Sequence, residues 1–259
     1  MSKRYRLALI VCSFVAACFS VSGFAATETE YLELDLEQLL QVSISGSTLR
    51  DESLKTVPAQ VTVFSREQLD VLGFDYLYEL MRLVPGFQVN RSADNPVNYT
   101  FSASGRRLGT RAREVALLVD GRQFVDPRSS GADSSFSLFP LANIERVEII
   151  QGPGSAIYGS GAYTGLINIV SRRKGKSLSI SAGSDQRRKA DLHWNYEQGD
   201  WQANIYGHAY EDQGQDYHFA NGEQTQDPRE ELGLDLGIQY RQSRLQLAWF
   251  RLTADDFYM

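Results

Sequence analysis

The second half of the chain repeats one pattern, in which apolar and polar side chains alternate over segments of about ten residues. A β-strand points successive side chains to opposite faces, so this alternation gives each strand one apolar and one polar face. The segments approach the roughly 9–11 residues that a tilted strand needs to cross a bilayer. Short turns at 198–200 and 242–244 flank one long polar stretch, 211–231. Residues 173–259 are therefore predicted to form antiparallel strands of a transmembrane β-barrel, and the alternative is an amphipathic sheet of a soluble protein.

About five such strands fit into this stretch. Five tilted strands cannot close a cylinder, and an open sheet edge in lipid would leave backbone groups unpaired. No closing strand is recognisable at 255–259. The barrel is thus incomplete, and we expect a fragment of a longer protein or a truncated reading frame.

The first 25 residues have the features of a cleaved signal peptide. A basic start precedes the apolar run Leu7–Phe19, which is short for a membrane span, and small residues favour cleavage after Ala25. The alternative is a lipoprotein box at Val15–Cys18, with Cys18 acylated. No later run approaches the 18 or so apolar residues of a membrane helix.

Composition narrows the function further. Both cysteines, Cys12 and Cys18, lie in the leader, so the mature chain has no disulfide or thiol chemistry. The formal net charge is −6, and loss of the basic leader makes the chain more acidic, which argues against a nucleic-acid binder. The three histidines show no metal-ligand spacing, and His193 and His208 fall on polar strand faces. We therefore expect an exported protein without metal.

Residues 54–172 are predicted to form a small α+β domain. Gln60–Phe64 has the composition of a strand. Ser65 and Gln68 have the capping-box spacing of a helix that Gly73 would end.

A second helix is expected from Asp75 and is ended by Pro85. Its apolar residues recur at helical spacing and form one stripe, which favours a core position over a ligand site: Leu77, Leu80, Met81 and Val84. Further on, Asp120-Gly121 predicts a tight hairpin turn.

Two apolar runs, 144–150 and 166–170, enclose a glycine-rich loop. Such a backbone must turn tightly or pass close to another group. The loop faintly resembles a phosphate loop, but Ser160 stands where a lysine is required. Because no nucleophile–base pair can be assembled either, an enzyme is not expected.

Four stretches in fixed order resemble TonB-dependent outer-membrane receptors. They are LVPGFQV (Leu83–Val89), SGRR (Ser104–Arg107), LLVDGRQFVDP (Leu117–Pro127) and IERVEIIQGPGSAIYGSGAYTGLINIVSR (Ile144–Arg172). The resemblance implies an α+β plug domain, 54–172, inside a barrel that in large outer-membrane transporters has about 22 strands. It covers nearly half of the chain.

The resemblance implies active uptake of a scarce, bulky ligand, such as an iron–siderophore or cobalamin, at the bacterial outer membrane. TonB in the periplasm would supply the energy, and neither a bond-making step nor a cofactor is implied. Within the extension 26–53, the segment that pairs with TonB by strand addition would fall at Gln41–Ser47, with an ordinary linker as the alternative. Its candidate residues are Gln41, Val42, Ser43, Ile44 and Ser45.

Loop position alone suggests ligand-contact residues on the plug domain, and ordinary surface loops are the alternative for each of them. The candidates are Arg91, Asp94, Asn95 and Tyr99 in one loop and Arg128 and Ser134 in another.

The resemblance also implies charge locks between plug and barrel, with the positive charge on the plug. The family often has an arginine before the glycine of the first plug motif, and a basic residue before the later Gly-Pro. Ser104 and Gln151 stand at these positions, which leaves Arg106, Arg107 and Gln151 as contact candidates. The remaining alternative for the whole chain is a barrel pore or adhesin without TonB coupling.

Overall fold

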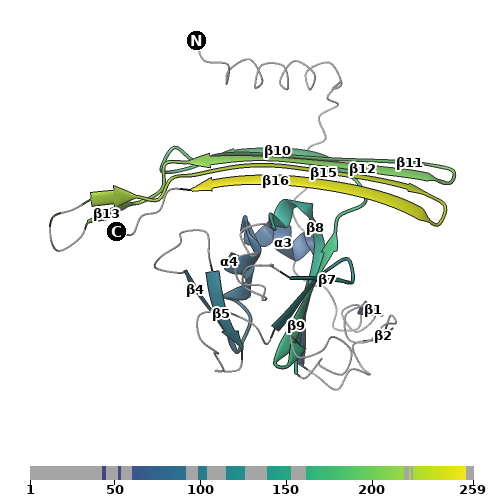
Figure 1. The fold of residues 1–259 in the computed structure, drawn as a ribbon, viewed down its shortest axis with the longest axis horizontal. Coiled ribbons are helices and arrows are strands. Elements are labelled where there is room, and N and C mark those ends of the chain that lie inside the picture. Colours follow the sequence, from purple (N-terminus) through teal and green to yellow (C-terminus); the bar gives the residue numbers. More distant parts are fainter. Residues whose placement is uncertain are drawn as a thin grey trace, which may run out of the picture. The chain divides into compact units, whose positions relative to one another are not determined.

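The structure is a computed structural model, and it describes residues 43–44, 52–53, 60–91, 99–103, 115–125, 139–152, 162–218, 222 and 224–254. All of them belong to one compact unit, Leu36–Met259. The expected signal peptide and Cys18 lie outside the described residues. Figure 1 shows two main sheets, one in the plug domain and one formed by the long strands that follow it. No helix in the described part of the chain is long and apolar enough to cross a membrane.

The plug domain has a mixed five-stranded sheet, which confirms its α+β class. Strands β6 and β9 are parallel and the other neighbours are antiparallel. In sheet order the strands are β3 (Gln60–Phe64), β8 (Ile144–Gln151), β9 (Gly165–Ser171), β6 (Val115–Val119) and β7 (Arg122–Phe124). Two hairpins lie beside it, β4 (Phe87–Arg91) with β5 (Tyr99–Ala103) and β1 (Ser43–Ile44) with β2 (Glu52–Ser53).

The first helix, α3 (Arg66–Leu72), begins and ends as its sequence signals predict. The Ser65 hydroxyl accepts from the amide of Gln68, and the Gln68 side chain accepts from the amide of Ser65 at 3.0 Å. These bonds satisfy two backbone donors that a helix start leaves open. Gly73 ends the helix with φ 64°, a left-handed conformation that glycine adopts without a Cβ clash.

The second helix, α4 (Leu77–Met81), starts two residues later than expected. Tyr76 is extended and acts as the N-cap, and the Glu79 carboxylate accepts from the amides of Asp75 and Tyr76 at 2.8 and 3.0 Å. Glu79 therefore fixes the helix start after Tyr76 by capping those amides.

The predicted apolar stripe is buried, although α4 ends at Met81, before Val84 and short of the predicted end at Pro85. Leu77, Leu80, Met81 and Val84 are each at most 2% exposed. They share one core with a short 3₁₀ turn, η3 (Leu141–Asn143), and with side chains of β8 and β9. This burial of apolar surface is the main stabilising contribution to the plug domain.

The strands flanking the glycine-rich loop are direct neighbours, and Gln151 pairs with Gly165. A Cβ on Gly165 would lie 2.9 Å from the carbonyl oxygen of Ile150. The close approach that the glycines suggested is therefore made here by the plug's own backbone. Residues 153–161 of the loop lie outside the described part.

The second sheet, called the long sheet below, is antiparallel throughout and runs in the order β10-β11-β12-β15-β16. Its strands are β10 (Lys176–Ala182), β11 (Arg188–Gln198), β12 (Trp201–Asp212), β15 (Arg229–Tyr240) and β16 (Ser243–Ala254). The polar stretch between β12 and β15 contains a small hairpin of β13 (Asp216–His218) and β14 (Gln224–Gln226).

The turns of the long sheet are tighter than expected. Gln198 pairs with Trp201 and Tyr240 pairs with Ser243, so two-residue turns replace the three-residue turns predicted at 198–200 and 242–244. Gly199 has φ 57° and Arg241 has φ 52°. Positive φ is what two-residue hairpin turns require, so the strands extend further than side-chain alternation alone indicates.

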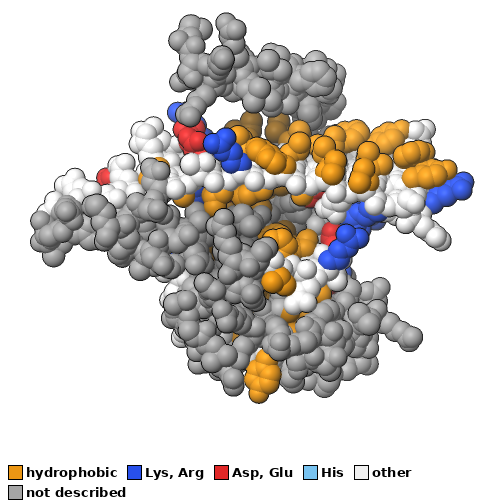
Figure 2. Space-filling model, viewed as in Figure 1, with side chains coloured by type: hydrophobic (Ala, Val, Ile, Leu, Met, Phe, Trp, Pro, Cys, Tyr) orange, Lys and Arg blue, Asp and Glu red, His pale blue; other side chains and the backbone are white. Residues whose placement is uncertain are grey.

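The long sheet has one apolar and one polar face, as the alternation predicts. Exposed apolar side chains gather on one face, and Figure 2 shows them following the strands; they include Leu178, Ile180, Leu232, Leu234, Ile238, Leu245, Leu247 and Trp249. The other face carries buried polar side chains, which include Asp191, His193, His208 and Glu231, and two of these, His193 and Glu231, contact the plug domain.

Candidate functional site: the contact between plug domain and long sheet

The polar face of the long sheet carries a row of ionisable side chains near one end of β11, β12 and β15. The strand register places Lys189 beside Tyr210 and Tyr210 beside Glu231. Asp191 pairs with His208 one step further along. Because side chains two residues apart share a strand face, all five groups point toward the plug domain.

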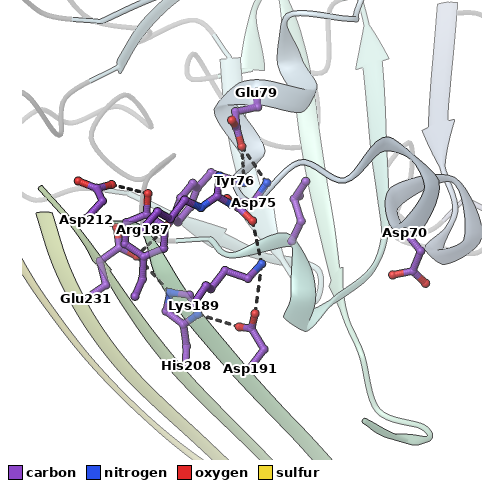
Figure 3. A network of polar contacts seen from close by, with 12 residues as sticks. Asp70, Asp75, Tyr76, Glu79, Arg187, Lys189, Asp191, His208, Asp212 and Glu231 are labelled. Carbon is purple, nitrogen blue, oxygen red and sulfur yellow. Dashed lines mark hydrogen bonds and ion pairs between the residues drawn. The ribbon is translucent and has the colours of Figure 1, made fainter. Parts of the chain in front are cut away.

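Asp75 of the plug domain joins this row directly (Figure 3). One carboxylate oxygen contacts the guanidinium of Arg187, and the other lies 2.8 Å from Nζ of Lys189. Lys189 also lies 3.2 Å from Oδ2 of Asp191. Asp75 is 8% exposed, so its charge is held in a poorly solvated place by two cations.

Tyr76 makes the adjoining contact. Its hydroxyl donates to Oε2 of Glu231 at 2.9 Å, and its ring lies 4.6 Å from the guanidinium carbon of Arg229. The ring also packs edge-on against Tyr210, with 5.8 Å between centroids. Burial raises the pKa of Tyr76, so the phenol keeps the proton that it donates.

His208 links the two carboxylates of the long sheet. Its Nδ1 lies 2.7 Å from Oδ1 of Asp191, and its Nε2 lies 3.3 Å from Oε2 of Glu231. A neutral imidazole has one N–H, so contact with two carboxylate oxygens requires a second proton on the ring or on a carboxylate. The Tyr206 hydroxyl also donates to Asp191 at 2.8 Å. The network is therefore continuous from the plug domain across three strands.

A second ionic contact lies at the hairpin turn of the plug domain. Oδ2 of Asp120 lies 2.9 Å from Nη2 of Arg173 and 3.7 Å from Nη2 of Arg244, which is in β16. Oδ1 accepts from the amide of Ser171 at 3.0 Å. Asp120 has φ 51° in the predicted hairpin turn, and this conformation and the Ser171 bond orient its carboxylate.

A third contact involves a predicted ligand-contact residue. The guanidinium of Arg91, at the end of β4, pairs with Asp227 and lies 3.4 Å from the hydroxyl of Tyr217 in β13. Tyr217 in turn donates to Asp227 at 3.2 Å. Tyr99, another candidate, is buried and stacks on Tyr78 with 3.7 Å between ring centroids.

These residues border a pocket of about 400 Å³ between the plug domain and the strand ends. Its lining contains tyrosines, arginines and an equal number of acidic residues, and it includes Tyr78, Arg82, Arg91, Tyr99, Tyr210, Tyr217, Glu79, Asp185, Asp212 and Asp227. Arg187 and Arg229 of the buried network line it as well. A polar pocket with aromatic walls can hold a small molecule by stacking and charge.

The other predicted site residues are placed as follows. Gln151 ends β8, and its Nε2 donates to the carbonyl oxygen of Pro85 at 2.6 Å, a contact within the plug domain. Ser43 and Ile44 form β1 and pair with Ser53 and Glu52. The remaining candidates lie outside the described residues: Gln41, Val42, Ser45, Asp94, Asn95, Arg106, Arg107, Arg128 and Ser134.

Sequence reasoning did not identify Asp75 or Tyr76 as contacts. The two residues precede an apolar helix stripe, and that position alone indicates only a helix start. A better signal was available in the long sheet. Lys189, Asp191, Arg229 and Glu231 place ionisable groups at alternate positions on the predicted inner face, and buried charges need partners. Within the described part of the chain, no group of metal-ligating side chains is arranged to hold an ion.

Comparisons with known proteins agree with this architecture. Residues 53–166 match the sequence model of the TonB-dependent Receptor Plug Domain. The vitamin B12 transporter BtuB of Vibrio vulnificus (strain CMCP6) is 32% identical over 170 residues, which are 64% of this chain and 27% of that protein.

Two solved structures share the fold. FpvA of P. aeruginosa, bound to heterologous pyoverdines, aligns with a TM-score of 0.64 at 18% identity. The alignment covers 80% of this chain and 26% of the FpvA chain. The siderophore receptor PiuA of Acinetobacter baumannii aligns with a TM-score of 0.59 at 22% identity, over 85% of this chain and 30% of its own. The present chain thus spans about a quarter to a third of the length of these relatives.

Proposed function

Because this chain belongs to the TonB-dependent receptors, we propose that it is part of an outer-membrane receptor that takes up a scarce, bulky ligand with energy relayed by TonB. The observation that carries the proposal is a plug domain held by ion pairs of its buried Asp75 against the polar face of a sheet whose other face is apolar and exposed. In a barrel, the apolar face meets lipid and the polar face lines the lumen. The chain would be exported by the signal peptide 1–25.

The ligand is proposed to bind at the pocket beside Arg91 and Tyr99. The pocket lies where β12 and β15 are joined by the long connection that contains β13 and β14, and outer-membrane barrels place long connections outside the cell. The relative named as a vitamin B12 transporter supports cobalamin as the ligand class, and an iron–siderophore is the alternative, because PiuA, which shares the fold, is named as a siderophore receptor. We propose no catalytic step for this chain.

The TonB partner is proposed to pair with Gln41–Ser45. The experiment is replacement of these five residues by alanine in the full-length receptor, and the matched control replaces Thr27–Tyr31 in the same way. We expect the Gln41–Ser45 variant to bind labelled cyanocobalamin or iron–siderophore at the cell surface but to lose uptake. The control should retain both binding and uptake.

The alternative function, a pore or adhesin without TonB coupling, predicts a different result. Uptake would then survive in the Gln41–Ser45 variant and would also survive dissipation of the proton-motive force. Surface binding that persists in an Arg91→Ala, Tyr99→Ala double variant with unchanged affinity would place the ligand elsewhere.

A further inference from the structure

Two contacts between plug domain and long sheet share one polarity. Asp75 and Asp120 supply negative charge from the plug domain, and positive charge comes from Lys189 in β11, Arg187 just before it and Arg244 in β16. We propose that Asp75 and Asp120 form a two-point clamp that seats the plug domain on the long sheet. Its polarity is opposite to that of the arginine-based locks that the resemblance implies, and Ser104 and Gln151 stand where those charges would be.

The Asp75 point is held firmly from both sides. On the plug side, the amide of Asp75 donates to Glu79 and its carbonyl oxygen accepts from the amide of Leu141 at 2.8 Å, so the backbone is fixed. On the sheet side, Lys189 is held by Asp191, which His208 and Tyr206 also contact. Lys189 is therefore already ordered by the sheet, and it loses less side-chain entropy when it pairs with Asp75.

At the second point of the clamp, Asp120 pairs with only one cation of the long sheet, but its carboxylate is also held in one orientation. Its carboxylate is directed by the turn and by the Ser171 amide, and Oδ2 faces two guanidinium groups. Arg173 lies just after β9, where the chain leaves the plug domain, whereas Arg244 lies in the long sheet. Asp120 therefore ties the plug hairpin both to the connection between domains and to the sheet.

The two points lie near opposite ends of the long sheet. The register places Glu231 in the row of Lys189, and Gln239 in the row of Arg244. Positions 231 and 239 of one strand are about 26 Å apart, at roughly 3.3 Å per residue. One ionic contact allows the plug domain to pivot about it in any direction, but two contacts so far apart leave only rotation about the line that joins them.

The clamp can be tested by the mobility of a spin label on the plug domain in the full-length receptor. Val71 in α3 is 68% exposed and suits a single labelled cysteine in a cysteine-free background. We expect Asp75→Asn and Asp120→Asn each to lower the urea concentration at which the label becomes mobile, and the double variant to lower it further. Asp70→Asn is the matched control, because Asp70 is exposed and pairs with Arg66 of its own helix.

A charge swap separates a specific lock from general destabilisation. Asp75→Arg should release the plug domain at a still lower urea concentration than Asp75→Asn does. Adding Arg187→Asp should raise that urea concentration again, part of the way to the wild-type value. The proposal is overturned if Asp75→Asn and Asp120→Asn behave as Asp70→Asn does, or if the swap brings no recovery.

Two further measurements separate loss of the clamp from failure of the barrel to fold. Heat-modifiable migration in gels shows whether each variant barrel is folded. If Asp75→Arg does not assemble, Asp75→Glu takes its place: it retains the charge and should keep the label immobile at urea concentrations that release Asp75→Asn. Label mobility needs neither ligand nor TonB, so failure of uptake would contradict the proposed function without affecting the clamp.

Discussion

The hydroxyl of Tyr76 in the plug domain donates to Oε2 of Glu231 in the long sheet at 2.9 Å, and both residues are 1% exposed. The two residues are 155 positions apart in the sequence. The same carboxylate oxygen faces His208 at 3.3 Å, and Oε1 lies 3.2 Å from Nε of Arg229. One buried glutamate thus joins Tyr76 of the plug domain to the network of the long sheet, and it keeps all of its partners only while the plug domain is in place.

Removal of this hydroxyl tests that dependence. Tyr76→Phe keeps the ring stacked near Arg229 but leaves a buried charged acceptor with one donor fewer. We expect the plug domain to be destabilised by about 1–3 kcal/mol. The measurement is the urea midpoint for mobility of the Val71 label. Tyr196→Phe, whose hydroxyl bonds Gln198 on an exposed surface, should leave the midpoint unchanged. A midpoint equal to the wild type for Tyr76→Phe would contradict this reading.

The carboxyl of Glu79 gives a pH dependence of known sign. Burial raises the pKa of Glu79 above 4.5, so the folded protein holds this proton more tightly than the unfolded chain does. The stability that comes from the shifted pKa is therefore fully present below about pH 4.5 and is lost as the pH rises through the raised pKa. Glu79→Gln keeps an oxygen for the amides of Asp75 and Tyr76 without the charge. We expect the free energy of unfolding of Glu79→Gln, relative to wild type, to increase from about pH 4 to about pH 8.

Glu67 is a control for which the pH dependence of stability should have the opposite sign. The hydroxyl of Ser65 donates to it at 2.7 Å and lowers its pKa, so its contribution is present above pH 4.5 and is lost as the pH falls. Wild type should therefore lose its advantage over Glu67→Gln toward acid. If the Glu79 and Glu67 variants changed in the same direction with pH, the assignment of both groups would be wrong.

The capping box of α3 predicts a further loss of stability. Ser65→Ala removes the acceptor for the amide of Gln68 and the donor for Glu67, and we expect the plug domain to lose about 1 kcal/mol. Gln68→Glu keeps an acceptor for the Ser65 amide and should change the unfolding midpoint much less. Urea titration of the Val71 label measures both. Equal midpoints for Ser65→Ala and the wild type would show that the cap contributes nothing here.

The close approach at Gly165 predicts that even alanine is poorly tolerated. Its Cβ would meet the Ile150 carbonyl oxygen at 2.9 Å, and backbone in a paired strand cannot move aside as a side chain can. We expect Gly165→Ala to cost about 1–3 kcal/mol, as other overpacking changes do. In Gly207→Ala the nearest atom would be Leu192 Cβ at 3.9 Å, so that control should fold and migrate normally. Wild-type stability of Gly165→Ala would show that β8 and β9 separate readily.

The sequence alone predicted the two helices and the long strands because the signals concerned are local, but it did not predict β5 or the hairpin of β13 and β14. Alternation along 201–210 and 232–241 follows from the pleat of a single strand, and the helix at Ser65 follows from a capping box of four residues, Ser65–Gln68. Turn lengths were less well predicted. Arg241 continues the alternation of its strand in the sequence, and only the paired backbone shows that the strand ends at Tyr240 and that Arg241 is in the turn.

The sequence by itself determined that this chain has an α+β domain, strands with one apolar and one polar face, and charges on the polar face. Only the tertiary structure decided which charges meet. Asp75 and Arg187 are 112 positions apart, and Tyr76 and Glu231 are 155 apart. Periodicity fixes the face on which a side chain lies, but not how one domain is turned against another. That orientation depends on the sum of many packing and ion-pair contacts between distant segments, for which a single sequence carries no local signal.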